Sequence, residues 1–368
     1  MTIYNYLELL FIILFVIEIS RRSSQHRRLI FFYIESFFVF FILAFRNYNV
    51  GADSILYTNY YSNPNTYRGQ MPWGFEFFCD FLKIFSDDWR FFIFVTSFLA
   101  IIPFLYYVKK YASIVSLPFL TFLLCWDLLW LLETPIKQTT AIAFFFWGYL
   151  LLIKEVKHYK WLKNLLALIL IVFSVLNHST IVIVIMVFLI LHFVRVSKRM
   201  AVISIIISIL LSSTMIVFIP SLFDTLQTYA MAFQLFNNIQ NHVEDVAIGL
   251  ITYDIKKILL PSLFVVLLLL MCNKKQVESM PAKCIVAGTI IFNLFIAFPN
   301  IPRVVLPFTL IGTALCPTDY KLLSNRNMKY IRYAHLSMIL IFFYLHLKKC
   351  ITFTTDFDAD ILPYSFWF

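Results

Sequence analysis

Apolar residues recur along this chain in uninterrupted runs, and few stretches show the alternation typical of half-buried strands. The runs last about 17 to 20 residues, the length that crosses a bilayer as a helix. Inside the hydrocarbon layer a helix satisfies its own backbone hydrogen bonds. The pattern predicts an all-α, polytopic membrane protein of about twelve helices, with residues 1–368 forming a single transmembrane domain. The predicted spans are Tyr4–Ser20, Leu29–Phe45, Phe91–Val108, Leu117–Leu132, Pro135–Ile153, Leu162–Leu176, Thr180–Val194, Ala201–Ile219, Ile258–Cys272, Lys283–Phe298, Val304–Cys316 and Ile331–Leu347.

The composition agrees with this pattern. Hydrophobic residues make up 61% of the 368 residues and charged residues only 14%. A soluble domain is about half apolar and about a quarter charged. The chain is therefore not expected to form a soluble globular domain.

Basic residues accumulate in alternate loops, which predicts the orientation, because Lys and Arg favour the cytoplasmic side. The basic loops contain Arg21, Arg22, Arg27 and Arg28; Lys109 and Lys110; Lys154, Lys157, Lys160 and Lys163; Arg195, Lys198 and Arg199; Lys274, Lys275 and Lys283; and Lys321, Arg326, Lys329 and Arg332. The opposite loops hold most of the acidic residues, so both termini are expected outside. The net charge of +10 then reflects topology. No nucleic-acid partner is expected, since the chain lacks a solvated basic and aromatic domain.

Two long loops interrupt the spans on the predicted outer side, at about residues 46–90 and 220–257. Adjacent helices need only short connections, and long ordered loops usually carry function. The first loop contains an apolar and aromatic stretch between Trp73 and Phe85. This stretch predicts a helix that lies along the membrane interface and covers the bundle.

The first loop opens with two charged candidates, Arg46 and Asp53. Gly51 lies between them and permits a turn that brings both to the same helix end. Arg46 would then serve as a cationic clamp and Asp53 as an acid or base. The alternative is an interfacial arginine and a helix N-cap aspartate.

Polar residues also interrupt two later spans at the predicted outer side. Lys137 enters the membrane within the first turn of the span that begins at Pro135, where it needs an anionic ligand or an acidic partner such as Asp127 or Glu133; a snorkelling lysine is the alternative. His178, in Asn177-His178-Ser179-Thr180, could act as a base or bind phosphate, or could belong to a capping cluster.

A lone cation, Arg303, follows Pro299-Asn300-Ile301-Pro302. It is either an anion-binding group or an interfacial anchor. The six cysteines show no metal-binding spacing, and no phosphate-loop, zinc-protease or serine-esterase motif occurs. No metal or other cofactor is expected.

Taken together, these segments resemble the EpsG/Wzy-like family of bacterial polysaccharide polymerases. The segments that carry the resemblance are Arg46 with Val50-Gly51-Ala52-Asp53 and Tyr57; Gly74-Phe75-Glu76; Lys137-Gln138-Thr139-Thr140-Ala141; His178-Ser179; and Arg303. Ala52 stands where the family tends to show Thr, and Lys137 where it tends to show Arg.

The resemblance implies a glycosyltransferase of O-antigen, capsule or similar surface polysaccharide synthesis, in the bacterial inner membrane. It would transfer a growing glycan from undecaprenyl diphosphate to the next lipid-linked repeat unit at the periplasmic face. The implied partners are the lipid-linked oligosaccharide, the bilayer and a chain-length regulator.

The chemistry implied by this reaction assigns roles to the candidate residues. The leaving diphosphate develops negative charge, which Arg46, Lys137 and Arg303 would stabilise. The acceptor hydroxyl needs a base, for which Asp53, Glu76 and His178 remain alternatives. Gln138 and Tyr57 would bind substrate, and aromatic residues of the first loop would stack on sugars. Two competing hypotheses are a flippase of lipid-linked oligosaccharide, which predicts charged residues deep in many spans, and a polytopic acyltransferase that modifies the glycan.

Overall fold

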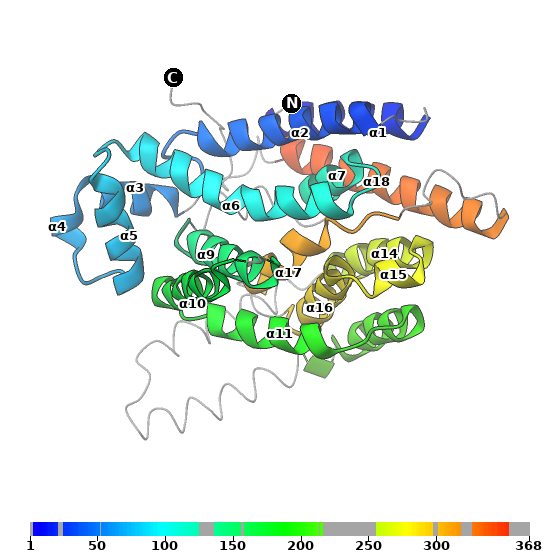
Figure 1. Cartoon of the computed structure of the whole chain (residues 1–368). Coiled ribbons are helices and arrows are strands. Elements are labelled where there is room, and N and C mark those ends of the chain that lie inside the picture. The colour runs from blue at the N-terminus through cyan, green and yellow to red at the C-terminus, as the bar shows by residue number, and fades with distance from the viewer. Residues whose placement is uncertain are drawn as a thin grey trace. The chain divides into compact units, whose positions relative to one another are not determined.

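The structure is a computed structural model that describes residues 3–20, 25–51, 53–124, 136–155, 158–212, 214–215, 255–296, 301–317 and 326–352. The elements in these ranges are helices, which confirms the all-α prediction (Figure 1). Their bounds are α1 Ile3–Ser20, α2 Gln25–Ala44, α3 Ser54–Ser62, α4 Pro64–Tyr67, α5 Trp73–Lys83, α6 Trp89–Tyr111, α7 Ser116–Leu124, α9 Ile136–Ile153, α10 Lys160–Asn177, α11 Ile181–Phe193, α14 Ile255–Met271, α15 Lys274–Val277, α16 Met280–Leu294, α17 Ile301–Gly312 and α18 Arg326–Thr352. Residues 198–212 are also helical.

Within the described residues, five helical segments are long and apolar enough to cross a membrane. They are Ile3–Ser20, Trp89–Tyr111, Ile136–Ile153, Lys160–Asn177 and Lys329–Lys348. The chain is thus a multi-pass membrane protein, and the count of about twelve spans stays a prediction. Nearly all of the predicted 220–257 loop, together with Asp127 and Glu133, lies outside the described residues.

The chain divides into two compact units. The first contains Met1–Phe193 and Ile339–Phe368, and the second contains Val194–Met338. Each unit is described by itself, and the single transmembrane domain over the whole chain remains a prediction.

In the first unit, α9 and α10 form a closely packed antiparallel pair. A Cβ atom on Gly148 would lie 2.7 Å from Cγ1 of Ile171 and 2.8 Å from the carbonyl oxygen of Ala167. Small residues allow helix backbones to approach closely in membranes, where contact area drives association. The antiparallel pairing places the start of α9 beside the end of α10.

The first predicted loop is folded onto these helix ends. It forms α3, α4 and α5, which confirms the helix predicted within Trp73–Phe85, and Figure 1 shows the three helices beyond the end of α6. One face of α5 packs against α3, α6 and the start of α9 in a buried cluster. The segment therefore covers the helix ends of this unit.

In the second unit, α16 and α17 pack through two glycines. A Cβ atom on Gly312 would lie 2.6 Å from Cβ of Ile285, and one on Gly288 would lie 3.1 Å from Cβ of Phe308. A buried polar group links three helices of this unit. The Asn293 amide Nδ2 donates to the hydroxyls of Ser208 and Ser262, both at 2.9 Å.

We expect Asn293→Leu to lower the stability of the protein only modestly. Side-chain hydrogen bonds between membrane helices average about 0.6 kcal/mol each, so two of them predict a loss of about 1 kcal/mol. Ser208 keeps a bond to the Ile205 carbonyl at 2.8 Å after the change. Thermal unfolding of purified protein in detergent measures the effect. A loss of several kcal/mol would mean that this contact organises the unit far beyond its hydrogen bonds.

Candidate active site

Arg46 lies buried at the C-terminal end of α2, with only 1% of its surface exposed. Its Nη1 donates to the Leu43 carbonyl, and to the Ser97 hydroxyl of α6 at 3.0 Å. Ser97 Oγ in turn donates to the same carbonyl at 2.9 Å. The last carbonyls of a helix lack partners within the helix, and a cation is favourable there. Arg46 therefore ties the end of α2 to α6.

A small cavity of about 10 Å³ adjoins Arg46. Ser97 and Thr96 of α6 line it together with Ile136 and Thr139 of α9. A space of this size holds about one water molecule. Within the described residues, Arg46 therefore acts on its surroundings through its charge and its hydrogen bonds.

The chain turns sharply after Arg46 and brings Asp53 back to the same region. Gly51 has φ +94°, a left-handed conformation that favours glycine, as the sequence predicted. The Val50 amide donates to the Asn47 carbonyl at 3.1 Å, and the Ser54 amide donates to that of Gly51 at 3.0 Å. Asp53 thus reaches the N-cap position of α3, but its side chain makes no capping hydrogen bond.

Asp53 instead interacts electrostatically with Lys137. Lys137 is half-buried in the first turn of α9, directly after Ile136 of the cavity wall. The peptide dipoles give this helix end a positive potential. The structure thus gathers three sequence-predicted residues, Arg46, Asp53 and Lys137, and their net charge of one positive unit suits an anion.

His178 lies at the same end of the unit, as the C-cap residue of α10. Its Nδ1 and the Thr180 hydroxyl share a hydrogen bond of 2.7 Å. Phe173 of α10 packs against the cluster that contains Ile136, which places the last turn of α10 beside the first turn of α9. Four predicted positions therefore occupy helix ends at one side of the first unit. They are Arg46, Asp53, Lys137 and His178.

Gly74 lets α5 approach the end of α10. A Cβ atom at Gly74 would lie 2.6 Å from the carbonyl carbon of Leu176 and 2.8 Å from the nitrogen of Asn177. Only a residue without a side chain fits against this backbone. The Gly74-Phe75-Glu76 and His178-Ser179 motifs, about a hundred residues apart in sequence, are therefore neighbours in the fold.

We expect Gly74→Ala to push α5 away from α10 and to destabilise the protein. Forcing an extra methyl group against backbone costs about 2 kcal/mol. Gly69→Asn is the matched control, because that site is open and its φ of +83° is one that Asn tolerates. Thermal unfolding in detergent compares the two variants. Equal melting temperatures for Gly74→Ala and the wild type would refute the close contact.

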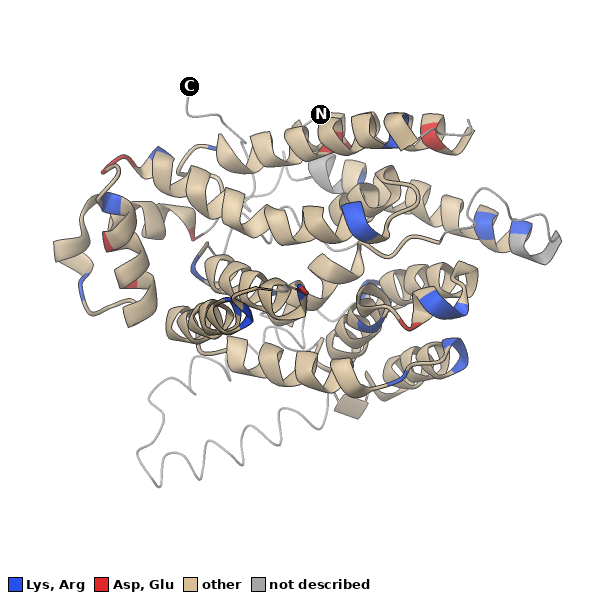
Figure 2. Ribbon diagram, viewed as in Figure 1, with Lys and Arg blue, Asp and Glu red and all other residues tan. Residues whose placement is uncertain are grey.

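Glu76, another candidate base, stabilises the turn at Gly69. Its Oε1 accepts a hydrogen bond from the Gly69 amide at 2.7 Å, and the nearby Arg68–Asp80 ion pair has a separation of 2.9 Å. Figure 2 shows acidic and basic positions together on the α3–α5 segment and at the start of α6. Most of these charges have partners within the segment.

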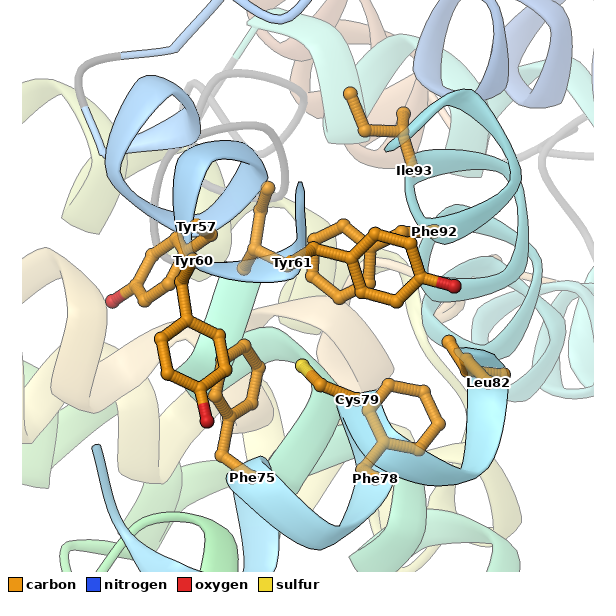
Figure 3. Packing of buried hydrophobic residues seen from close by; sticks show 10 residues of the cluster. Tyr57, Tyr60, Tyr61, Phe75, Phe78, Cys79, Leu82, Phe92 and Ile93 are labelled. Atoms are coloured by element: carbon orange, nitrogen blue, oxygen red, sulfur yellow. The ribbon is translucent and has the colours of Figure 1, made fainter. Parts of the chain in front are cut away.

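Tyr57 and its neighbours are core residues in this structure. The Tyr57 ring packs edge-on against Phe75 with centroids 5.5 Å apart, and Tyr61 stacks on Phe92 at 4.9 Å (Figure 3). Burial raises the pKa of the Tyr60 and Tyr61 hydroxyls above an ordinary value that already keeps tyrosine neutral at physiological pH. Trp73 is 63% exposed, unlike these tyrosines, and its ring stacks on Phe77 with centroids 5.6 Å apart.

The two remaining predicted residues are Gln138, which follows Lys137 in α9, and Arg303. Gln138 is buried, with 6% of its surface exposed. Arg303 is partly buried in the first turn of α17, which belongs to the second unit. Within the described residues, no group of three or more His, Cys, Asp or Glu side chains could hold a metal ion.

Three buried glutamates in the first unit were not recognised from the sequence. The Glu18 carboxylate accepts the backbone amides of Val115 and Ser116 at 3.1 and 3.0 Å, at the start of α7. Glu8 contacts His346 Nδ1 at 2.8 Å, and Glu35 is fully buried beside Ser116. The available signal was an acidic residue inside an apolar run, which marks a functional candidate by default.

Comparison with known proteins supports the sequence resemblance. The sequence model described as the EpsG family matches residues 29–366. No curated protein and no solved structure gives a match. Because the family match covers nearly the whole chain and includes all the candidate positions above, this protein belongs to the EpsG family.

Proposed function

We propose that the chain is a glycosyltransferase that polymerises lipid-linked oligosaccharide repeat units. It transfers a growing glycan from undecaprenyl diphosphate to the next lipid-linked unit at the periplasmic side of the inner membrane. Membership of the EpsG family is consistent with a polysaccharide polymerase. The observation that carries the proposal is the grouping of Arg46, Lys137 and Asp53 at helix ends on one side of the first unit.

Lys137 is the cation that meets the diphosphate in this mechanism. It is less buried than Arg46 and lies at the positive end of α9. The departing diphosphate gains negative charge as the glycosidic bond breaks, and a fixed cation at that position lowers the barrier. Arg46, which is more deeply buried, adds to the positive potential. Its hydrogen bond to Ser97 also joins the end of α2 to α6.

Asp53 and His178 are the bases that best suit the acceptor hydroxyl. The Glu76 carboxylate accepts a hydrogen bond from the Gly69 amide, and Asp53 interacts electrostatically with Lys137. A general base must be deprotonated at working pH to accept the hydroxyl proton. Arg303 is a further cation for the carrier lipid in this proposal, and a chain-length regulator is a further partner.

A deletion strain tests the proposed reaction. Without this gene, surface polysaccharide should shrink from a ladder of lengths to a core that bears one repeat unit. Restoration of the ladder by the wild-type gene provides the control. An unchanged ladder would contradict the proposal, and normal chain lengths that lack acetyl groups would indicate an acyltransferase.

A flippase of lipid-linked oligosaccharide is the second candidate, favoured by the buried Glu8, Glu18 and Glu35. Transport pathways commonly contain intramembrane acids. Two of the three have local partners that explain their burial, since Glu18 accepts the α7 amides and Glu8 contacts His346. Loss of lipid-linked substrate translocation in Glu35→Gln, with polymerisation in vitro intact, would favour transport.

A further inference from the structure

The second unit contains a cavity that the proposed reaction does not use. It has a volume of about 530 Å³ and is lined by residues 195–198, 200, 274, 277 and 278. Three of these residues are cations, Arg195, Lys198 and Lys274, against one acid, Glu278. The basic loops at 195–199 and 274–283, which the sequence places independently on the cytoplasmic side, therefore meet at one cavity.

Hydrogen bonds across the cavity walls hold it in shape. Lys198 Nζ donates to the Leu270 carbonyl at 3.0 Å, near the end of α14. Asn273 and Gln276 form a reciprocal capping box around α15, and Gln276 Nε2 donates to the Cys316 carbonyl at 2.6 Å. These contacts fix one wall to α14 and to the segment after α17. The cavity is thus a built feature of the second unit.

The positive potential of the cavity has two sources. Its lining carries a net charge of two positive units. The helix at residues 198–212 also begins there, and its Met200 amide donates to the Ser197 hydroxyl at 3.2 Å. The peptide dipoles make such a helix start favourable for phosphate. The chemistry of the cavity therefore suits a phosphate group.

An exposed apolar row begins at this cavity and points to a lipid as the source of the phosphate. Met200 lines the cavity, and Ile203 and Ile207 continue along the same helix at helical spacing. Their exposed fractions are 57%, 43% and 48%. An acyl chain can lie along such a row while its headgroup meets the cations. A soluble phosphate compound would make no use of it.

We propose that this cavity binds the phosphate headgroup of an anionic glycerophospholipid of the cytoplasmic leaflet. Basic pockets between transmembrane helices on that side recognise anionic headgroups. Arg195 and Lys274 contact the phosphate, Lys198 shapes the wall, and the Met200 row receives an acyl chain. The assignment depends on the membrane setting and is independent of the polymerase reaction.

The test uses purified full-length protein in a neutral detergent and short-chain phosphatidylglycerol as the probe. Wild-type protein should bind phosphatidylglycerol more tightly than short-chain phosphatidylcholine. Arg195→Gln combined with Lys274→Gln should weaken phosphatidylglycerol binding by about 30-fold, from about fivefold for each cation near a lipid headgroup. Unchanged melting temperature without lipid shows that this variant folds.

The matched control is Lys154→Gln combined with Lys160→Gln, which removes the same charge from another basic loop, at exposed positions that do not line the cavity. It should leave the affinity nearly unchanged. Equal losses in the two double variants would overturn the proposal in favour of diffuse surface charge. Full affinity in the cavity variant would also overturn it. If glycerol phosphate displaced phosphatidylglycerol when both are present at the same concentration, the cavity would be assigned to a soluble phosphate compound instead of a lipid.

Discussion

Replacing Lys137 by Gln is expected to reduce polymerisation by about 100-fold while the protein remains folded in the membrane. Removing one preorganised group that stabilises charge in a transition state typically costs about 100- to 1000-fold in rate. Gln retains the length and polarity of the side chain but lacks its charge. Lys137 is half-buried at the start of α9, where its charge adds to the positive potential of the helix. The rate of glycan elongation from lipid-linked repeat units measures the effect.

Two variants control for this prediction. Lys137→Arg keeps the charge and gains a fork suited to phosphate, so it should retain most of the activity. Arg68→Gln removes a different cation of the same unit, one that is 60% exposed and paired with Asp80, and should change little. A Lys137→Gln protein with wild-type elongation would remove Lys137 from the mechanism. A comparable loss in Arg68→Gln would point to general surface charge.

Arg46→Ala should abolish detectable polymerisation and also lower stability. The change removes the buried charge and the ties to the Leu43 carbonyl and to Ser97. Breaking a hydrogen bond to a charged group costs about 1.5 to 3 kcal/mol. Arg46→Lys keeps the charge and should recover part of the activity. Elongation rates and melting temperatures in detergent, measured on the same preparations, separate the two effects.

Ser97→Ala distinguishes a charge effect of Arg46 from a purely structural one. This change removes the hydroxyl that joins Arg46 and the Leu43 carbonyl, and leaves the guanidinium charge in place. It should cost about 1 kcal/mol of stability and leave most of the elongation activity. If Ser97→Ala were as inactive as Arg46→Ala, the role of Arg46 would be to hold α2 against α6.

The sequence was most informative where one local rule decides the structure. Long apolar runs predicted helices at α6, α9 and α10 within a few residues of their observed bounds, because a bilayer permits little else. Gly51 was correctly expected to form a turn, since few other residues adopt its positive φ. The helix within Trp73–Phe85 followed from its apolar spacing.

The fold reveals packing partners that are distant in sequence. Tyr57 was expected to bind substrate and the aromatic residues of the first loop to stack on sugars. The fold adds that the rings of Tyr57 and Tyr61 pack on Phe75 and Phe92, which come from other helices. The effect of Gly74 depends on the backbone of Leu176 and Asn177, a hundred residues away. Burial of this kind depends on tertiary partners, which a single sequence does not reveal.

The buried glutamates show a second limit of prediction from sequence. An acidic residue in a span can be recognised from sequence, but its partner cannot. Glu18 is satisfied by the first amides of α7, and Glu8 by His346 near the other end of the chain. Only the fold shows these partners, and it also shows that Asp53 interacts electrostatically with Lys137 at the candidate site.

Reconstitution of the purified protein tests whether it polymerises lipid-linked repeat units by itself. Proteoliposomes that contain only this protein are supplied with lipid-linked repeat units on the face where the α3–α5 segment lies. We expect glycans of two, three and more repeat units on the carrier lipid, with release of undecaprenyl diphosphate and no requirement for a second protein. Lys137→Gln proteoliposomes should lose nearly all of this product. Folded wild-type protein that leaves every repeat unit unextended would contradict the proposed polymerase function.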